Sequence, residues 1–219
     1  MELKIFLKEL FDFGVNKNLF IVKEIGKLDK TCCTDSIINA IDFDYTKDVI
    51  CEKLNLSHYK SCDALILLID SERIDFIEMK GLKEYLNPNH NNSLDINSDI
   101  KKQLKNKVTN FNLVQKIQDS LDILKLILQD KDFKYSKSDK ESFKQIKKNF
   151  IVLTDIESSK NGLEFIIASF DILSENSSSL ENICMEIFSE EINDLEFPNI
   201  YNIQKPISIN CDGLTKYYA

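Results

Sequence analysis

The chain has 219 residues, of which 43% are hydrophobic and 29% are charged, and its formal net charge is −8. This composition is typical of a globular protein and excludes a chain that is disordered throughout. The negative charge argues against a broad nucleic-acid-binding surface, because phosphate contacts supply most of the non-specific affinity. Any nucleic-acid contact must use a local basic patch, or a protein partner must supply the basic surface.

The elements expected in the first part of the chain follow from hydrophobic spacing. They are a helix over 3–13, a strand over 19–25, a short helix through 37–41 that Thr34 or Asp35 caps, and an amphipathic turn or two over 46–55. The N-terminal helix carries several charges and lacks the uninterrupted apolar core of a signal peptide, so we expect none. No stretch approaches the ~20 apolar residues of a membrane span. We therefore expect no membrane segment and a cytoplasmic location.

The segment 64–80 contains the clearest local pattern. Residues 64–69 (ALILLI) form an unbroken apolar run, typical of a buried strand, and a polar break follows. Residues 74–80 then alternate, so that one face carries Ile74, Phe76, Glu78 and Lys80. Two strands joined by a short polar link predict a β-hairpin.

Later elements complete an α/β pattern. The Asn- and Lys-rich segment 87–110 is expected to be a long, mobile loop running into the next helix. After it we expect a helix over 113–128, a strand over 150–154, helices over 163–173 and 180–192, and a short strand over 207–211. The whole chain, 1–219, is predicted to be one α/β domain with a small central mixed β-sheet flanked by helices.

The hairpin is expected to bring charged side chains together. If Asp70 pairs with Arg73, then Asp63 lies opposite Lys80 and Glu78 is the diagonal neighbour of Asp63. Two carboxylates and an ammonium would converge on one face of the sheet. Carboxylate oxygens are the ligands that Mg²⁺ prefers, and a bound Mg²⁺ keeps waters and positions for phosphate oxygens.

The stretch KSCDALILLIDSERIDFIEMKG (60–81) resembles the core hairpin of the PD-(D/E)xK nuclease superfamily. The resemblance implies a restriction-endonuclease-like core over about 34–155 and hydrolysis of phosphodiester bonds with Mg²⁺ or Mn²⁺. It implies that Asp63 and Glu78 are metal ligands, that the backbone carbonyl of Met79 is a third ligand, and that Lys80 is the catalytic lysine. The substrate would be nucleic acid, with DNA favoured over RNA, in bacterial or phage defence.

One residue of this sequence differs from the family pattern, and one expected metal ligand is not assigned to a single residue. Cys62 stands where the family has proline. Many members add an acidic ligand from the preceding helix, and four residues are candidates: Glu24, Asp35, Asp44 and Glu52. Gln115 and Gln118 on the later helix are further candidates for facing the site.

Two other interpretations remain. The charges on Asp63 and Lys80 are also consistent with a surface ion pair across an exposed hairpin, which contributes little to stability. The alternative function is a catalytically inactive, nuclease-like subunit that binds a protein partner.

His58 and His90 have no evident catalytic partner in the sequence.

The six cysteines show no spacing of a zinc or redox motif. They are Cys32, Cys33, Cys51, Cys62, Cys184 and Cys211. Several lie in apolar stretches, where a free thiol behaves as a small hydrophobic group. We therefore predict that all six are reduced and that none binds zinc.

Overall fold

The computed structural model describes residues 3–57, 59–86, 99–133, 137–156, 177–195, 202–204 and 206–219. Its strands are β1 (Val22–Glu24), β2 (Asn39–Asp42), β3 (Ala64–Leu68), β4 (Arg73–Lys80), β5 (Lys147–Thr154) and β6 (Ile207–Asn210). Its α-helices are α1 (Leu3–Asn16), α2 (Phe43–Leu54), α3 (Lys83–Leu86), α4 (Ile100–Asn110), α5 (Leu113–Leu128), α6 (Lys137–Gln145), α8 (Ser177–Asn193) and α9 (Cys211–Tyr218). A short 3-10 helix, Ile25–Lys27, follows β1.

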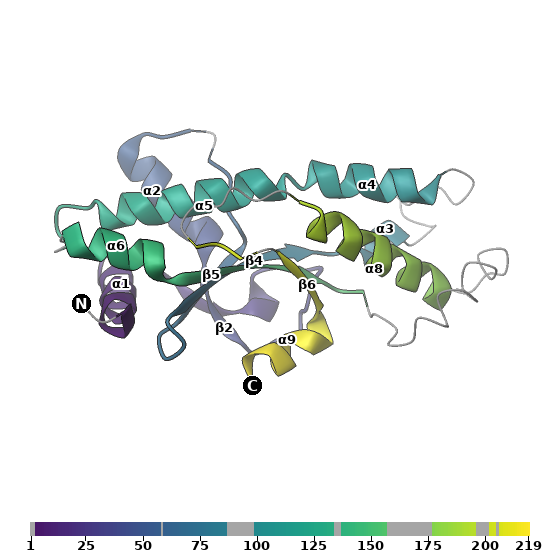
Figure 1. Ribbon diagram of the computed structural model, residues 1–219, viewed down its shortest axis with the longest axis horizontal. Coiled ribbons are helices and arrows are strands. Elements are labelled where there is room, and N and C mark those ends of the chain that lie inside the picture. Colours follow the sequence, from purple (N-terminus) through teal and green to yellow (C-terminus); the bar gives the residue numbers. More distant parts are fainter. Residues whose placement is uncertain are drawn as a thin grey trace.

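The strands form one mixed, open sheet in the order β1-β2-β3-β4-β5-β6. Strands β1 to β4 are antiparallel neighbours, whereas β5 runs parallel to β4 and β6 runs parallel to β5. Helix α5 lies along one face of the sheet and α9 packs against the opposite face (Figure 1). The predicted α/β class with a mixed central sheet and flanking helices is confirmed.

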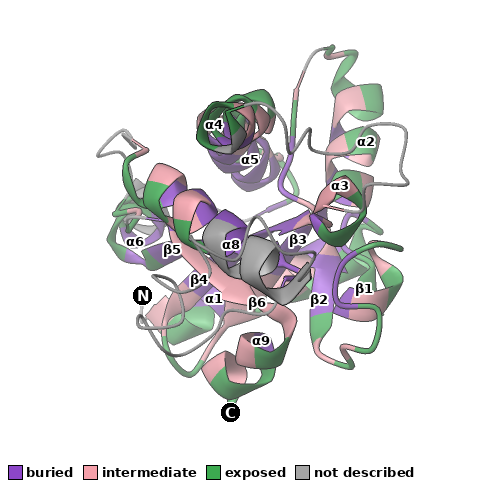
Figure 2. Cartoon of the chain, turned by 90° about the vertical axis from the view of Figure 1, so that its right-hand side faces the viewer, coloured by how far each residue is buried: buried purple, intermediate pink, exposed green. Residues whose placement is uncertain are grey.

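Each face of the sheet has its own hydrophobic core. The face that packs on α5 buries Phe76 of β4 and Phe150 of β5, together with residues of α1, α2 and α8. The other face buries Ile77 and Met79 against Leu214 of α9. Figure 2 shows the resulting pattern, with buried residues concentrated on the central strands and on the inner sides of the helices. The predicted alternation of faces along β4 is therefore correct.

The hairpin forms as predicted, but its register differs by two residues. Leu67 pairs with Ile74 and Leu68 pairs with Arg73, so Asp63 extrapolates to a position opposite Glu78 and not opposite Lys80. Strand β3 ends at Leu68 and β4 begins at Arg73, because the Glu72 amide donates to the Ile69 carbonyl (3.2 Å) and closes a turn between them. Since the shift is even, every side chain keeps its predicted face.

The short helix predicted near residues 34–41 is wrong. The segment loops back along the end of β1, where the Ile25 amide donates to the Ile38 carbonyl (2.8 Å), and continues into β2. The side chain of Asp29 organises the start of this loop by accepting from the amides of Thr31 (2.6 Å) and Cys32 (2.9 Å). These pairings satisfy the backbone without a helix.

Most other predicted elements are confirmed, with shifted ends. The first helix continues to Asn16, and α2 begins at Phe43 because the Asp42 carboxylate caps it by accepting from the Tyr45 amide (3.0 Å). The predicted long loop is wrong over 100–110, which is α4, while 87–98 lie outside the described residues. The predicted helix over 163–173 also lies outside them. Among the described helices, none is both long and apolar enough to cross a bilayer.

The prediction that all six cysteines are reduced is wrong for one pair. Cys33 and Cys211 form a disulfide, with their Cα atoms 5.1 Å apart. They are separated by 178 residues, so no local spacing could indicate the pair. The fold brings them together because the loop before β2 and the start of α9 meet at the same end of the sheet. Cys32, Cys51 and Cys62 are free thiols.

Candidate metal centre

The candidate site lies where the apolar face of β4 becomes charged. Ile74 and Phe76 are fully buried on this face, and Glu78 follows them with no exposed surface. The side chain of Lys80 comes next and is 18% exposed, so the site opens towards solvent within two residues of a buried carboxylate. A buried acid at the end of an apolar strand face is costly unless it is paired or binds a cation.

Asp63 is held beside Glu78 by three contacts. One oxygen of its carboxylate, Oδ2, accepts from the Met79 amide (2.5 Å), and its backbone carbonyl accepts from the Phe43 amide (3.1 Å) at the start of α2. The preceding residue, Cys62, donates its amide to the Ser120 hydroxyl of α5 (2.9 Å). The position of Asp63 is therefore fixed by β4, α2 and α5 together.

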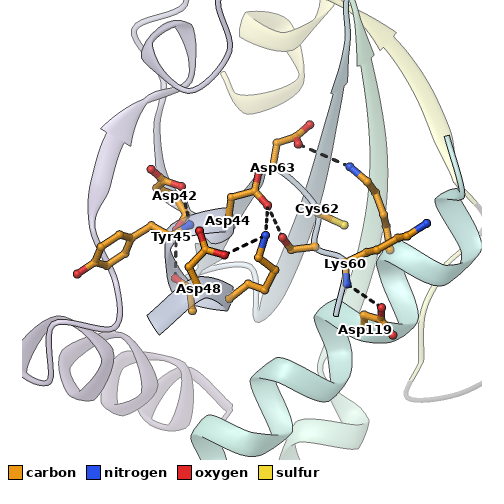
Figure 3. Close-up of polar contacts among 12 residues, drawn as sticks. Asp42, Asp44, Tyr45, Asp48, Lys60, Cys62, Asp63 and Asp119 are labelled. Atoms are coloured by element: carbon orange, nitrogen blue, oxygen red, sulfur yellow. Dashed lines mark hydrogen bonds and ion pairs between the residues drawn. The ribbon is translucent and has the colours of Figure 1, made fainter. Parts of the chain in front are cut away.

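Helix α5 also anchors the segment that leads to Asp63. The Lys60 amide donates to Asp119 Oδ2 (2.8 Å), and Gln115 donates its side-chain amide to Asp119 Oδ1 (2.6 Å). Gln115 therefore bonds within its own helix, and the structure does not place it against the carboxylates. Figure 3 shows Lys60 and Asp119 together beneath the end of the segment that carries Cys62 and Asp63.

A second lysine, which the sequence did not single out, lies at the centre of the site. Lys116 of α5 places its Nζ 2.5 Å from Glu78 Oε1 and 3.8 Å from Asp63 Oδ1. Lys80 also forms an ion pair with Glu78, and its ammonium lies 5.1 Å from the centre of the Phe111 ring. Two carboxylates and two ammonium groups therefore converge here.

The burial of this cluster changes its proton affinity. The pKa of Glu78 is raised from 4.5 to about 7, chiefly by burial and then by the nearby Asp63 charge, and both lysines oppose this rise. Burial likewise raises the pKa of Asp63, against the attraction of the same lysines. The pKa of Lys116 lies above its ordinary value because Glu78 and Asp63 outweigh the effect of burial.

One atom of the cluster has no partner. Oε2 of Glu78 is buried and makes no hydrogen bond, although Oε1 of the same carboxylate contacts both lysines. A buried carboxylate oxygen without a donor is unfavourable. A divalent cation beside Asp63 would satisfy it, so the donor set fits a hard cation that takes oxygen ligands.

The acid expected from the preceding helix is best matched by Asp44. It lies in the first turn of α2, accepts a hydrogen bond from the Ser61 hydroxyl, and its charge contributes to raising the pKa of Asp63. Figure 3 shows the carboxylates of Asp44 and Asp63 on neighbouring parts of the chain. Glu24 instead pairs with Lys27 (2.8 Å).

No described contact links the other two candidate acids, Glu52 and Asp35, to Asp63 or Glu78. Glu52 is exposed, and Asp35 lines a cavity at the end of the sheet. Within the described residues, no three acids, cysteines or histidines here have ligand atoms within 4.8 Å of one another. Met79 contributes its amide to Asp63, and a metal contact of its carbonyl stays a prediction.

Comparisons of this chain with protein-family models, curated proteins and solved structures find no match.

Proposed function

We propose that this chain is a nuclease that hydrolyses phosphodiester bonds with Mg²⁺ or Mn²⁺ held by Asp63 and Glu78. The observation that carries the proposal is the buried Glu78 carboxylate, whose Oε2 has no partner and which lies beside a second carboxylate at the open end of an apolar strand face. Both lysine ion pairs go to Oε1, so they leave Oε2 unsatisfied, whereas a cation shared with Asp63 would satisfy it. The restriction-endonuclease-like arrangement of the core belongs to the same proposal.

Each residue has a distinct role in the proposed reaction. The bound cation would polarise the phosphodiester and lower the pKa of a coordinated water. Asp63, fixed by the Met79 amide, and Glu78 supply the negative charge that holds this cation. Lys80, which lies partly exposed beside Glu78, donates to the oxygen that gains charge as the ester bond breaks.

Helix α4 offers a basic surface for the substrate. It contains four lysines (Lys101, Lys102, Lys105 and Lys107) and no acid, although the chain as a whole is strongly acidic. Lys105 pairs with Glu191 of α8 (2.7 Å), so the other three lysines carry the basic surface. The helix ends at Asn110, and the next residue, Phe111, lies against the Lys80 ammonium. A phosphate backbone along α4 would therefore be led towards the carboxylates. This local patch supports nucleic acid as the substrate class.

A second candidate function is supported by Lys116. Its ammonium occupies the position beside Glu78 Oε1 where a cation would otherwise balance the two acids. A lysine that replaces the metal would leave a nuclease-like scaffold that binds a protein partner without catalysis. The two functions predict different effects of Lys116→Ala on metal binding.

The test uses the purified chain with supercoiled plasmid, single-stranded DNA and RNA, each with Mg²⁺, Mn²⁺ or a chelator. We expect metal-dependent cleavage that Asp63→Asn, Glu78→Gln and Lys80→Ala abolish. Asp70→Asn is the matched control, because this acid lies on the same hairpin with its side chain fully exposed. Cleavage that survives all three substitutions would contradict the proposal.

Metal binding separates the two functions. We expect calorimetry to show Mg²⁺ or Mn²⁺ binding to the wild type that Glu78→Gln removes and Lys80→Ala retains. If the wild type binds neither ion and cleaves nothing, whereas Lys116→Ala gains metal binding, the scaffold interpretation is supported and the nuclease proposal fails.

A further inference from the structure

Three sulfur atoms from distant parts of the chain meet at the end of the parallel strands. Cys32 and Cys33 lie in the loop before β2, and Cys211 begins α9. Their Sγ atoms all lie within 4.8 Å of one another, and Cys32 Sγ is 3.7 Å from Cys33 Sγ. Across the described residues, no other group of three possible metal ligands is so close.

The third sulfur is not needed for the disulfide. Cys33 and Cys211 complete that bond between themselves, yet Cys32 is fully buried against it. Cys32 Sγ donates to the Leu153 carbonyl (3.5 Å), and Cys211 Sγ lies 3.2 Å from the carbonyl of Thr154, the next residue of β5. Strand β5 thus holds both sulfurs at a fixed separation.

The spacing suits a soft divalent cation. Zinc binds thiolate sulfur at about 2.3 Å in tetrahedral geometry, which places neighbouring sulfurs about 3.8 Å apart. The Cys32–Cys33 sulfur separation of 3.7 Å already matches this edge. The bonded pair, Cys33 and Cys211, would have to separate after reduction; Cys33 lies in the segment between the 3-10 helix and β2, and Cys211 is the first residue of α9.

A fourth position is accessible from a cavity. Cys33 and Cys211 both line a cavity of about 470 Å³, whose other walls include Thr34, Asn210 and Thr215. No fourth acid, cysteine or histidine of the described residues joins the three sulfurs. A water or another small ligand entering from the cavity would complete four-coordination, as in zinc sites with three protein ligands.

In contrast to the expectation from cysteine spacing in the sequence, we propose that Cys32, Cys33 and Cys211 form a three-thiolate zinc site in the reduced protein. An external dithiol breaks the Cys33–Cys211 bond by thiol–disulfide exchange: the dithiol is oxidised to a disulfide, and each cysteine gains one hydrogen. Binding of Zn²⁺ then releases the three thiol protons to the solvent. The ion replaces the disulfide as the link between the loop before β2 and α9. The zinc proposal does not rest on the proposed nuclease activity, although Cys32 lies beside the backbone of Lys80.

The test begins with wild-type protein reduced by a dithiol, treated with chelator and desalted without oxygen. We expect one Zn²⁺ per chain on titration, and with Co²⁺ a thiolate-to-cobalt absorption of a tetrahedral site. Cobalt held by the carboxylates of Asp63 and Glu78 would show no thiolate absorption. Reduced wild type that binds no Zn²⁺, or binds Co²⁺ without thiolate absorption, would overturn the proposal without affecting the proposed nuclease.

Variants then assign the ligands. Cys32→Ser, Cys33→Ser and Cys211→Ser should each weaken zinc binding by more than about tenfold. Cys51→Ser is the matched control, since Cys51 is a free cysteine on α2 and outside the sulfur cluster. Loss of zinc from this control to the same extent would contradict the assignment. If a ligand variant fails to fold, as judged by circular dichroism, the wild-type stoichiometry and cobalt spectrum still decide.

Discussion

Replacing Glu78 with glutamine should stabilise the metal-free protein, and the gain should grow with pH. In the folded chain, burial and the Asp63 charge raise the pKa of Glu78 to about 7, compared with 4.5 when it is unfolded. Between these values the unfolded chain has already released the proton that the folded chain retains. The free energy of unfolding therefore falls as the pH rises through this window. Glutamine resembles the protonated carboxyl and does not titrate.

The size of the effect follows from the two pKa values. One pKa unit corresponds to about 1.4 kcal/mol, so the ionised Glu78 costs about 1.4 kcal/mol at pH 5.5 and about 3 kcal/mol at pH 8. The free energy of unfolding of Glu78→Gln should exceed that of wild type by these amounts at the two pH values. For a chain of this size, about 3 kcal/mol corresponds to about 6–12 °C in Tm.

The assay is urea unfolding of wild type and Glu78→Gln at both pH values, in chelator. Glu52→Gln, an exposed change on α2, is the control and should alter neither free energy appreciably. Added Mg²⁺ should reverse the order, because the cation favours the ionised carboxylate of the wild type. A Glu78→Gln protein that is less stable than wild type at pH 8 in chelator would refute the reasoning.

Two other substitutions test neighbouring parts of the structure. Asp44→Asn should weaken Mg²⁺ binding by about threefold to tenfold, since one charge a few Å away contributes about 0.7–1.4 kcal/mol at high effective dielectric. Calorimetry measures this loss. An equal loss for Asp48→Asn, on the same helix, would contradict the prediction. Lys148 is fully buried, and burial lowers its pKa to about 7, so the unfolded chain binds more protons above that pH. The free energy of unfolding of wild type, measured relative to that of Lys148→Met, should therefore rise by about 2–3 kcal/mol between pH 7.5 and 9.5. Lys147 is exposed, so an equal rise relative to Lys147→Met would contradict this explanation.

The sequence predicted the parts of the site that depend on strand periodicity. Alternation along 74–80 placed Glu78 and Lys80 on one face, and the Asp63 carboxylate lies beside Glu78 despite the error in register. An even shift changes the pairing partner but not the face.

Features that depend on distant contacts could not be predicted. Lys116 is one of many lysines on amphipathic helices, and only the packing of α5 over β4 brings it to Glu78. The Cys33–Cys211 pair spans most of the chain. The segment that became β2 contains a helix-like spacing of isoleucines, yet Ile37 is 79% exposed and the backbone pairs with strands instead. Tertiary pairing outweighed the local pattern there.

The unequal lengths of the strands bear on how this protein avoids aggregation. The central strands β4 and β5 have eight residues each, whereas the edge strands of the described sheet, β1 and β6, have three and four. An exposed edge is a template on which another chain can add a strand, and short or charged edges limit this addition. At β1 the edge carries Lys23 and Glu24. The long apolar strands that would nucleate a cross-β assembly are thus enclosed on both sides, and a partially unfolded state that loses β6 would expose β5 first.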